Sequence, residues 1–236
     1  MNSSVLEIST LGLALSFAPS VIVLAILYRW RANAGTALYA TTRMLVQLLL
    51  IGYVLIYIFE TDHWGIIMLV LAVMLGVASW IAIRPLKQIT AADYLRSLLA
   101  ITIGGVLTLA LVTAVVLGVE PWFAPRYVVP LAGMIFAGSM TAVSLAADRL
   151  LLERERGTLP AAARRAALNT AMIPIVNSLF AVGLVALPGM MTGQVLSGVS
   201  PLIAAKYQIV VMTMLFGATG LSAAIYIPLD PTVNQS

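Results

Sequence analysis

The sequence of 236 residues has no cysteine and a single histidine, His63. Without cysteine the chain forms no disulfide, no thiolate metal site and no cysteine nucleophile. One imidazole also excludes a metal site built from several histidines of the same chain. Cysteine-based sites and multi-histidine metal sites within one chain are therefore excluded.

Charged residues are scarce as well. Asp, Glu, Lys and Arg make up 9% of the chain, against about 25% in soluble globular domains, and 61% of the residues are hydrophobic. The apolar runs reach about 20 residues, the length of helix that crosses roughly 30 Å of hydrocarbon. This composition predicts an all-α, polytopic membrane protein. The net charge of +4 does not indicate a nucleic-acid partner, because the basic residues lie in short loops.

Seven apolar runs predict seven transmembrane helices in one domain that covers residues 1–236. They lie at about 5–28, 44–59, 65–83, 98–117, 128–147, 168–187 and 203–227. The second run is short, and its helix is expected to begin nearer Ala40, with Arg43 inside it. No soluble domain, long linker or clear internal repeat interrupts the pattern.

The basic residues are distributed unequally over the two sides of the predicted bundle. The loops after the first, third and fifth spans hold Arg29, Arg31 and Arg43; Arg84, Lys87 and Arg96; and Arg149, Arg154, Arg156, Arg164 and Arg165. The other side has only Arg126 and Lys206. Because positive loops stay in the cytoplasm, we expect the N-terminus outside and the C-terminus inside.

The loop after the fifth span differs from the other loops because its sequence predicts helical structure. We predict that residues 153–167 form one cytoplasmic segment. A run of mixed charge extends the preceding helix, and Gly157 is placed to end it. Thr158 is a predicted N-cap for a short basic amphipathic helix at 160–167, with Pro160 in its first turn. Two interpretations stay open: a surface for a protein partner, or a solvated hairpin that only fixes the topology.

Polar and thioether side chains within and between the spans are candidates for a substrate path. Polar groups in hydrocarbon are costly unless they face protein or water. The candidates are Arg43, Gln47, Asn177, Met190, Met191, Gln194, Tyr207 and Gln208. The alternative interpretation makes Arg43 an interfacial anchor, the two methionines packing residues, and the amides hydrogen-bonding links between helices.

Three further features are ambiguous from the sequence. Pro174 lies inside the sixth span and predicts a kink. The segment 188–201 contains three glycines and is either a re-entrant turn or an ordinary loop. Glu60, Asp62 and His63 cluster at a span end and carry oxygen and nitrogen donors for a divalent metal ion, although a polar helix end is the simpler interpretation.

Several strings of the sequence together resemble the FetB-type ABC-transporter permease family. The most specific is LPGMMTGQ at 187–194, within the longer string 182–194. It is accompanied by 157–160 with the alanines that follow, and by 207–209. Residues 43–48 and 130–134 are similar too. The resemblance covers nearly the whole chain. Members of that family are described as bacterial iron exporters, and plant relatives act in aluminium tolerance.

The resemblance implies a permease subunit that exports iron, another metal or a small solute and works with a separate ATPase. ATP and Mg²⁺ would then lie in the partner, and this chain would bind no cofactor. The chain agrees in lacking a GxxxxGKS or GxxxxGKT phosphate loop. The resemblance further implies a homodimer in the inner (plasma) membrane, and an ATPase-coupling surface. Its residues would be Gly157, Thr158, Leu159, Pro160, Ala161, Ala162, Arg164 and Arg165.

Two other function classes remain open from the residues alone. One is a stand-alone channel or carrier, which needs no ATPase. The other is an intramembrane enzyme, such as a protease or a lipid-modifying transferase, which needs a nucleophile with a base, or two carboxylates, at membrane depth. No predicted span interior contains Asp, Glu or His. We therefore expect a transport subunit without catalysis of its own.

Overall fold

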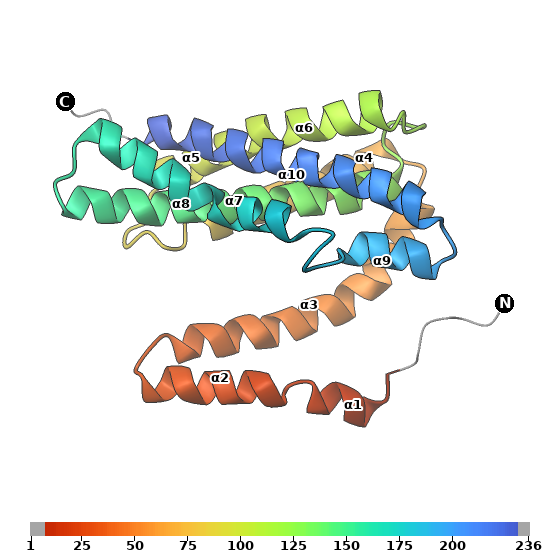
Figure 1. The fold of residues 1–236 in the computed structure, drawn as a ribbon, viewed down its shortest axis with the longest axis horizontal. Helices are drawn as coiled ribbons and strands as arrows, with labels where there is room; N and C mark the ends of the chain where they lie inside the picture. The colour runs from red at the N-terminus through yellow and green to blue at the C-terminus, as the bar shows by residue number, and fades with distance from the viewer. Residues whose placement is uncertain (1–7, 231–236) are drawn as a thin grey trace. The chain divides into compact units, whose positions relative to one another are not determined.

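A computed structural model describes residues 8–230, and this part of the chain consists of helices joined by short turns, without strands (Figure 1). Its contacts divide the chain into two compact units, Met1–Glu60 and Thr61–Ser236. Nothing in the apolar pattern marked this division, because both units are built from the same kind of membrane-length helix. Each unit is described by itself below.

The first unit is a pair of long helices with a short one before them. The helices are α1 (Thr10–Leu15), α2 (Ala18–Arg29) and α3 (Ala34–Glu60). Ser9 caps α1, since its hydroxyl accepts a hydrogen bond from the Gly12 amide at 3.1 Å. α2 packs against α3, and most of the side chains on both helices are exposed. Exposed apolar helices of this length have lipid as their natural surrounding.

The second unit is a helical bundle in which α7 and α10 form the centre. Its elements are α4 (Trp64–Ala82), α5 (Ala91–Ile101), η1 (Thr102–Val106), α6 (Leu107–Ala110), η2 (Leu111–Val116), α7 (Pro125–Glu155), α8 (Pro160–Ala181), α9 (Gly189–Leu196) and α10 (Pro201–Leu229). α10 packs against α5, α7 and α8, and α7 also packs against α4 (Figure 1). Most of the buried residues of the second unit lie on these contact faces.

Small residues let the helices of the second unit approach one another closely. On α8 the buried positions Ala163, Ala167, Ala171 and Ile175 follow one another at four-residue steps, which places them on one stripe of the helix. Membrane helices associate through such small side chains, because lipid provides no hydrophobic driving force between helices. The same stripe begins in the basic half of α8, so this half belongs to the bundle as well.

The fourth span is one continuous helical path that contains two π-helical segments, η1 and η2. It starts at a capping box in which the Thr90 hydroxyl accepts from the Asp93 amide and the Asp93 carboxylate accepts from the Thr90 amide. Within η1, Gly104 lies against α10, where an added Cβ would stand 2.5 Å from Oγ and 2.7 Å from the backbone N of Ser222. Only glycine fits this contact.

Two buried serine hydroxyls near Gly104, those of Ser139 and Ser222, form hydrogen bonds within the bundle. Ser222 Oγ donates to Ser139 Oγ at 3.0 Å, and the Ser139 hydroxyl lies 3.3 Å from the Ala218 carbonyl oxygen, which it approaches as a donor. These bonds join α7 to α10 in the interior. They hold the two central helices in one register, since a slip would leave buried hydroxyls without partners.

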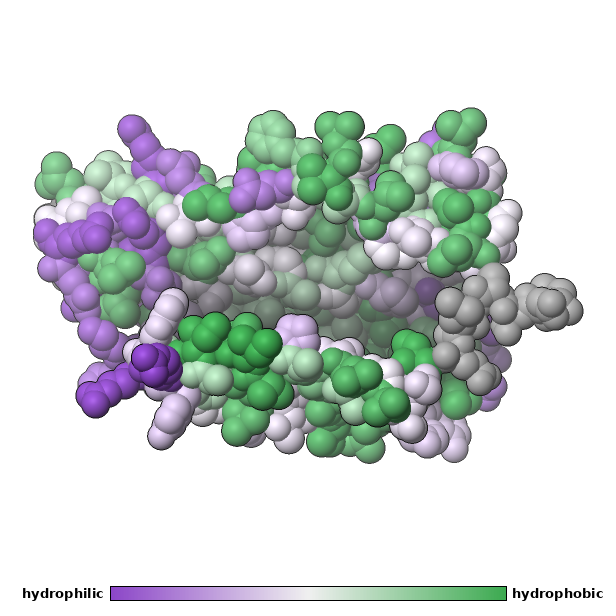
Figure 2. All heavy atoms as spheres, turned by 60° about the horizontal axis from the view of Figure 1, so that its bottom comes forward, coloured by the Kyte–Doolittle hydropathy of each residue, from purple (hydrophilic) through white to green (hydrophobic). Residues whose placement is uncertain are grey.

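Six helical stretches are long and apolar enough to cross a membrane: Thr10–Arg29, Ala34–Glu60, Trp64–Ala82, Ala91–Val116, Pro125–Glu155 and Pro201–Leu229. They correspond to six of the seven predicted spans, and they confirm the all-α, multi-pass membrane class. Figure 2 shows hydrophobic side chains over much of the visible surface. The first predicted span begins at residue 5, and residues 5–7 lie outside the described residues.

The structure differs from the sixth predicted span, 168–187. The basic helix at 160–167 and the following apolar run form one continuous helix, α8, which already ends at Ala181. The chain leaves the helix at Val182, which has extended backbone angles, and turns at Gly183, whose φ is 83°. The apolar run continues beyond the helix, so hydropathy alone placed the end too late.

Candidate functional site

The turn between α7 and α8, residues 156–159, is stabilised by backbone hydrogen bonds. Gly157 has a φ of 68°, and its amide donates to the Arg154 carbonyl at 3.0 Å, while the Thr158 amide donates to the Glu153 carbonyl at 3.1 Å. This pair of bonds is a Schellman motif, in which glycine is favoured at the left-handed position. Gly157 thus ends α7, as the sequence predicted.

The prediction that Thr158 caps α8 is wrong. Leu159 is the N-cap residue of α8 and makes no side-chain cap, and Pro160 is in the first turn. The Thr158 hydroxyl instead donates to Oε2 of Glu153 at 2.6 Å. The ionised carboxylate of Glu153 forms a stronger hydrogen bond than a neutral group would. The threonine side chain therefore points back to α7 rather than forward to α8.

Glu153 is the centre of a charged cluster at this end of the bundle. Only 5% of the residue is exposed, and its Oε1 lies 2.6 Å from Arg149 Nη2 and 3.6 Å from Arg156 Nη1. Beside it, Lys87 Nζ donates to Oε1 of Glu155 at 2.6 Å, which ties the α4–α5 loop to the end of α7. The turn is therefore held to its surroundings by charged side chains from three segments.

The predicted coupling residues divide into exposed and held positions. Leu159 follows Thr158, which bonds Glu153 of the charged cluster, and its residue is 76% exposed. Ala161, Ala162, Arg164 and Arg165 are also exposed, whereas Ala163 between them is buried against the bundle. We call Leu159, Ala161, Ala162 and Arg165 the coupling surface. It combines an exposed leucine, small side chains and a positive charge, which suits a protein partner with an acidic rim.

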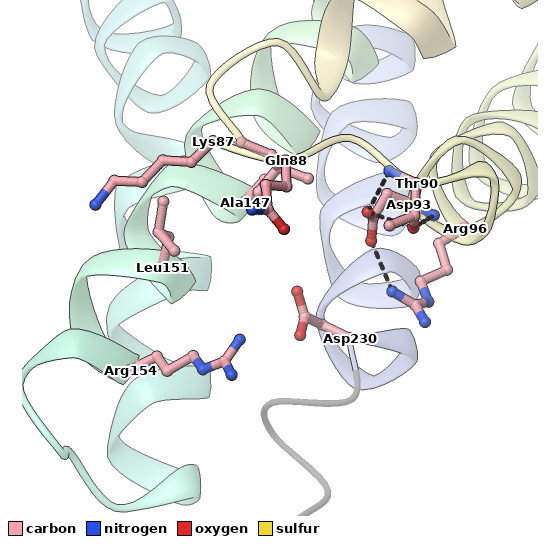
Figure 3. A pocket seen from close by; sticks show the side chains of 10 residues that line it. Lys87, Gln88, Thr90, Asp93, Arg96, Ala147, Leu151, Arg154 and Asp230 are labelled. Carbon is pink, nitrogen blue, oxygen red and sulfur yellow. Dashed lines mark hydrogen bonds and ion pairs between the residues drawn. The ribbon is translucent and has the colours of Figure 1, made fainter.

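A cavity of about 510 Å³ opens at the same end of the second unit, between the α4–α5 loop, α5, α7 and the end of α10 (Figure 3). Arg154 and Asp230 face each other across it, and Arg96 Nη1 is paired with Asp93 Oδ1 at 2.8 Å. Sequence reasoning missed this cavity, because its charged residues come from segments far apart in the chain. The concentration of charge in 84–96 and 149–165 was its only sign.

A second cavity, of about 330 Å³, lies at the opposite end of the second unit. It brings together Met190, Gln194 and Tyr207, three of the predicted path residues, with Arg126 and Tyr127 at the start of α7. Oε1 of Gln194 is buried and has no hydrogen-bond partner among the described residues. We call this cavity the opposite-end pocket.

A third cavity, of about 360 Å³, is lined by the two remaining predicted path residues of α9 and α10. It is lined by Met191 and Gln208 together with Met212. Gln208 is 6% exposed, and its Oε1 has no partner among the described residues. The neighbours Tyr207 and Gln208 on α10 therefore face two different cavities, as do Met190 and Met191 on α9. We call this third cavity the Gln208 pocket.

The other predicted path residues are not brought to these cavities. Asn177 is exposed on α8 and lines neither of them. Arg43 and Gln47 lie in the first unit, where they pair with each other on α3. With the amide oxygen turned toward the guanidinium, Gln47 accepts from Arg43 Nε at 3.1 Å and from Nη2 at 3.3 Å. This pairing follows from their i, i+4 spacing on one helix face.

The candidate metal ligands do not come together either. Within residues 8–230 no three His, Asp or Glu side chains form a group that could hold a metal ion, and this includes Glu60, Asp62 and His63. All three are exposed. Adjacency in the sequence is a poor guide at a helix start, because successive side chains leave the backbone in different directions.

The segment 188–201, predicted to be a re-entrant turn or a loop, contains the short helix α9. It begins after Pro188 and ends before Gly198, which has a φ of 89°. The LPGMMTGQ string supplies the first six residues of α9, including Met190, Met191 and Gln194. Its two faces line the opposite-end pocket and the Gln208 pocket.

Six membrane-length apolar helices define an α-helical, multi-pass membrane protein. It has a charged end and, at the opposite end of the second unit, cavities lined mostly by apolar residues with a few polar side chains. The model of the family described as "Uncharacterised protein family (UPF0014)" matches residues 8–158 and 154–230. The chain belongs to this family.

The chain is similar to curated proteins over most of its length. It is 35% identical to "Probable iron export permease protein FetB" of Escherichia coli, over 95% of this chain and 91% of the relative. It is 33% identical to "UPF0014 membrane protein YjkA" of Bacillus subtilis, over 90% and 91%. It is 34% identical to "Protein ALUMINUM SENSITIVE 3" of Arabidopsis thaliana, over 86% and 80%. No solved structure matches the chain.

Proposed function

We propose that the chain is the membrane subunit of an ATP-driven exporter, and that its substrate is iron, another metal ion or a small solute. The name of the Escherichia coli relative, an iron export permease, supports this proposal. The sequence has no phosphate loop of its own. ATP and Mg²⁺ would then be bound by a separate ATPase subunit.

The coupling surface is the observation that carries the proposal. Leu159, 76% exposed, lies beside the charged cluster on the side that the basic loops assign to the cytoplasm. Burying a leucine side chain contributes roughly 1.5–3 kcal/mol, so a partner that covers it gains affinity. Arg165 adds a positive charge that an acidic partner surface would attract.

The continuity of α8 supplies a route for coupling. One helix runs from Pro160 at the coupling surface to Ala181, and a tight turn connects it to α9, where Gln194 and Met191 line the two opposite-end cavities. A displacement of the coupling surface by the ATPase would move this whole helix. Two copies of the chain would complete the translocation path, since twofold assemblies are the commonest closed form.

Purification of the tagged chain from membranes of its own cell, in mild detergent, tests the proposal. A protein with a phosphate-loop motif should co-purify in stoichiometric amount, and the complex should hydrolyse MgATP. A charge change on the coupling surface, Arg165→Glu, should reduce the recovered ATPase, whereas Arg29→Glu in the first unit should not. A preparation without such a protein and without ATP hydrolysis would contradict the proposal and favour a stand-alone carrier.

A further inference from the structure

We propose that the opposite-end pocket binds a small solute that carries an oxyanion together with hydroxyl groups, such as a hydroxycarboxylate or its metal chelate. Arg126 would hold the oxyanion, and Gln194 would bond a hydroxyl. As a statement about the transported substrate, this rests on the proposed function. As a statement about binding, it stands on the pocket alone.

The charge of the pocket favours an anion. Arg126 is one of only two basic residues on its side of the predicted bundle. It makes no hydrogen bond or ion pair within residues 8–230, and no Asp or Glu lines the pocket. Since Arg126 lies in the first turn of α7, the helix dipole adds positive potential at the same place. A bare divalent cation would meet a guanidinium here and no carboxylate.

The amide of Gln194 favours a ligand that also has hydroxyl groups. Its buried Oε1 has no partner among the described residues, and a buried acceptor without a hydrogen bond costs free energy. If the O and N atoms of the Gln194 amide are exchanged, its NH₂ group, a hydrogen-bond donor, occupies the buried position instead. A hydroxyl satisfies either one, because it both donates and accepts. The phenols of Tyr127 and Tyr207 line the same pocket and have the same two capacities.

The size of the cavity and its flexible lining fit a small solute. The cavity of about 330 Å³ falls at the lower end of the range for small-molecule sites, roughly 300–1,000 Å³. Met134 and Met190 contribute flexible thioethers, which adapt to ligands of irregular shape. A phospholipid headgroup carries the same oxyanion chemistry, so the experiment separates the two sources.

Binding is measured on the full-length chain in phosphatidylcholine nanodiscs, by titration calorimetry with citrate, ferric citrate and Fe²⁺ alone. Citrate or ferric citrate should bind saturably. Arg126→Gln should weaken that binding roughly tenfold to a hundredfold, the range expected for a lost hydrogen bond to a charged group. Arg126→Lys should restore part of the affinity, because it keeps the charge. Lys206→Gln is the matched control, since it removes the other basic residue of this side, which does not line the pocket, and should leave affinity unchanged.

Three results would overturn the proposal. The first is no binding of either citrate species, and the second is equal affinity in Arg126→Gln and the wild type when both are folded. The third is Arg126-dependent binding of a short-chain phosphatidylglycerol without citrate binding, which would make the site a lipid anchor. Because no ATPase is needed, a failure of ATP-driven transport with citrate binding intact would contradict the proposed function and leave the pocket assignment standing.

Discussion

The hydroxyl of Thr158 donates a 2.6 Å hydrogen bond to Oε2 of Glu153, across the turn that joins α7 to α8. The backbone bonds of the Schellman motif lie within the same six residues, 153–158. The start of α8 is therefore attached to the end of α7 by main chain and side chain together. A partner that pushes on the coupling surface would move both helix ends, and not an independent loop.

Replacement of Thr158 by Val, which keeps the shape and removes the hydroxyl, should loosen this attachment. Glu153 would lose one of its partners while Arg149 stays in place. We expect faster amide hydrogen exchange in 155–162 and reduced stimulation of the ATPase. Thr158→Ser retains the donor and should behave like the wild type. Equal exchange in Thr158→Val and the wild type would show that the backbone motif alone holds the turn.

Gly104→Ala should destabilise the bundle, because the new Cβ would meet the backbone of Ser222 on α10. Overpacking of this kind costs about 1–3 kcal/mol. Gly217→Ala is the control, since nothing lies within 4 Å of a Cβ at that position. Unfolding in mixed detergent and SDS micelles measures both. Equal stability of the two variants would contradict the close contact between η1 and α10.

The topology can be tested without removing native thiols, because the chain has no cysteine. A cysteine at Thr61 should react with an impermeant reagent from outside and one at Leu159 only from inside. Leu159 is used rather than Gly157, whose φ of 68° disfavours any side chain. If α8 crosses the membrane, a cysteine at Ser197 shares the side of Thr61. Labelling of Thr61 and Leu159 from one side would contradict the predicted orientation.

Gln208→Met should lower transport without lowering stability. The side chain is buried with its Oε1 unpartnered among the described residues, so its removal relieves a cost of about 1–3 kcal/mol. The melting temperature is expected to stay equal or to rise, while the rate of substrate transport falls. Asn177→Leu, on the exposed face of α8, serves as the control and should transport normally. Normal transport by Gln208→Met would remove this residue from the path.

The fold class and most of the span positions could be predicted from hydropathy and length, because lipid imposes both. The end of α7 could be predicted as well, since a glycine after a charged helical run is typical of a helix C-terminus. The end of α8 could not: the apolar run 182–187 satisfies the hydropathy pattern, yet Gly183 turns the chain out of the helix.

The site was predictable only in part. The LPGMMTGQ string directed attention to Met190 and Gln194, and the structure places both in one pocket. It separates Met191 and Gln208 from them, because neighbours on a helix point about 100° apart. Arg126 was noted only as an exception to the charge asymmetry. Its place in the same pocket as Gln194 depends on the packing of α7, α9 and α10, which a single sequence does not show.

We propose that an ATPase drives transport through contact with the coupling surface. The most direct measurement is ATP-dependent accumulation of iron, supplied as Fe²⁺ and as ferric citrate, in proteoliposomes that hold the chain and its co-purified ATPase. The wild type and Arg29→Glu should accumulate iron, and Leu159→Glu and Arg165→Glu should lose most of this activity while remaining inserted. Undiminished accumulation in both coupling-surface variants, or equal accumulation without the ATPase, would contradict the account.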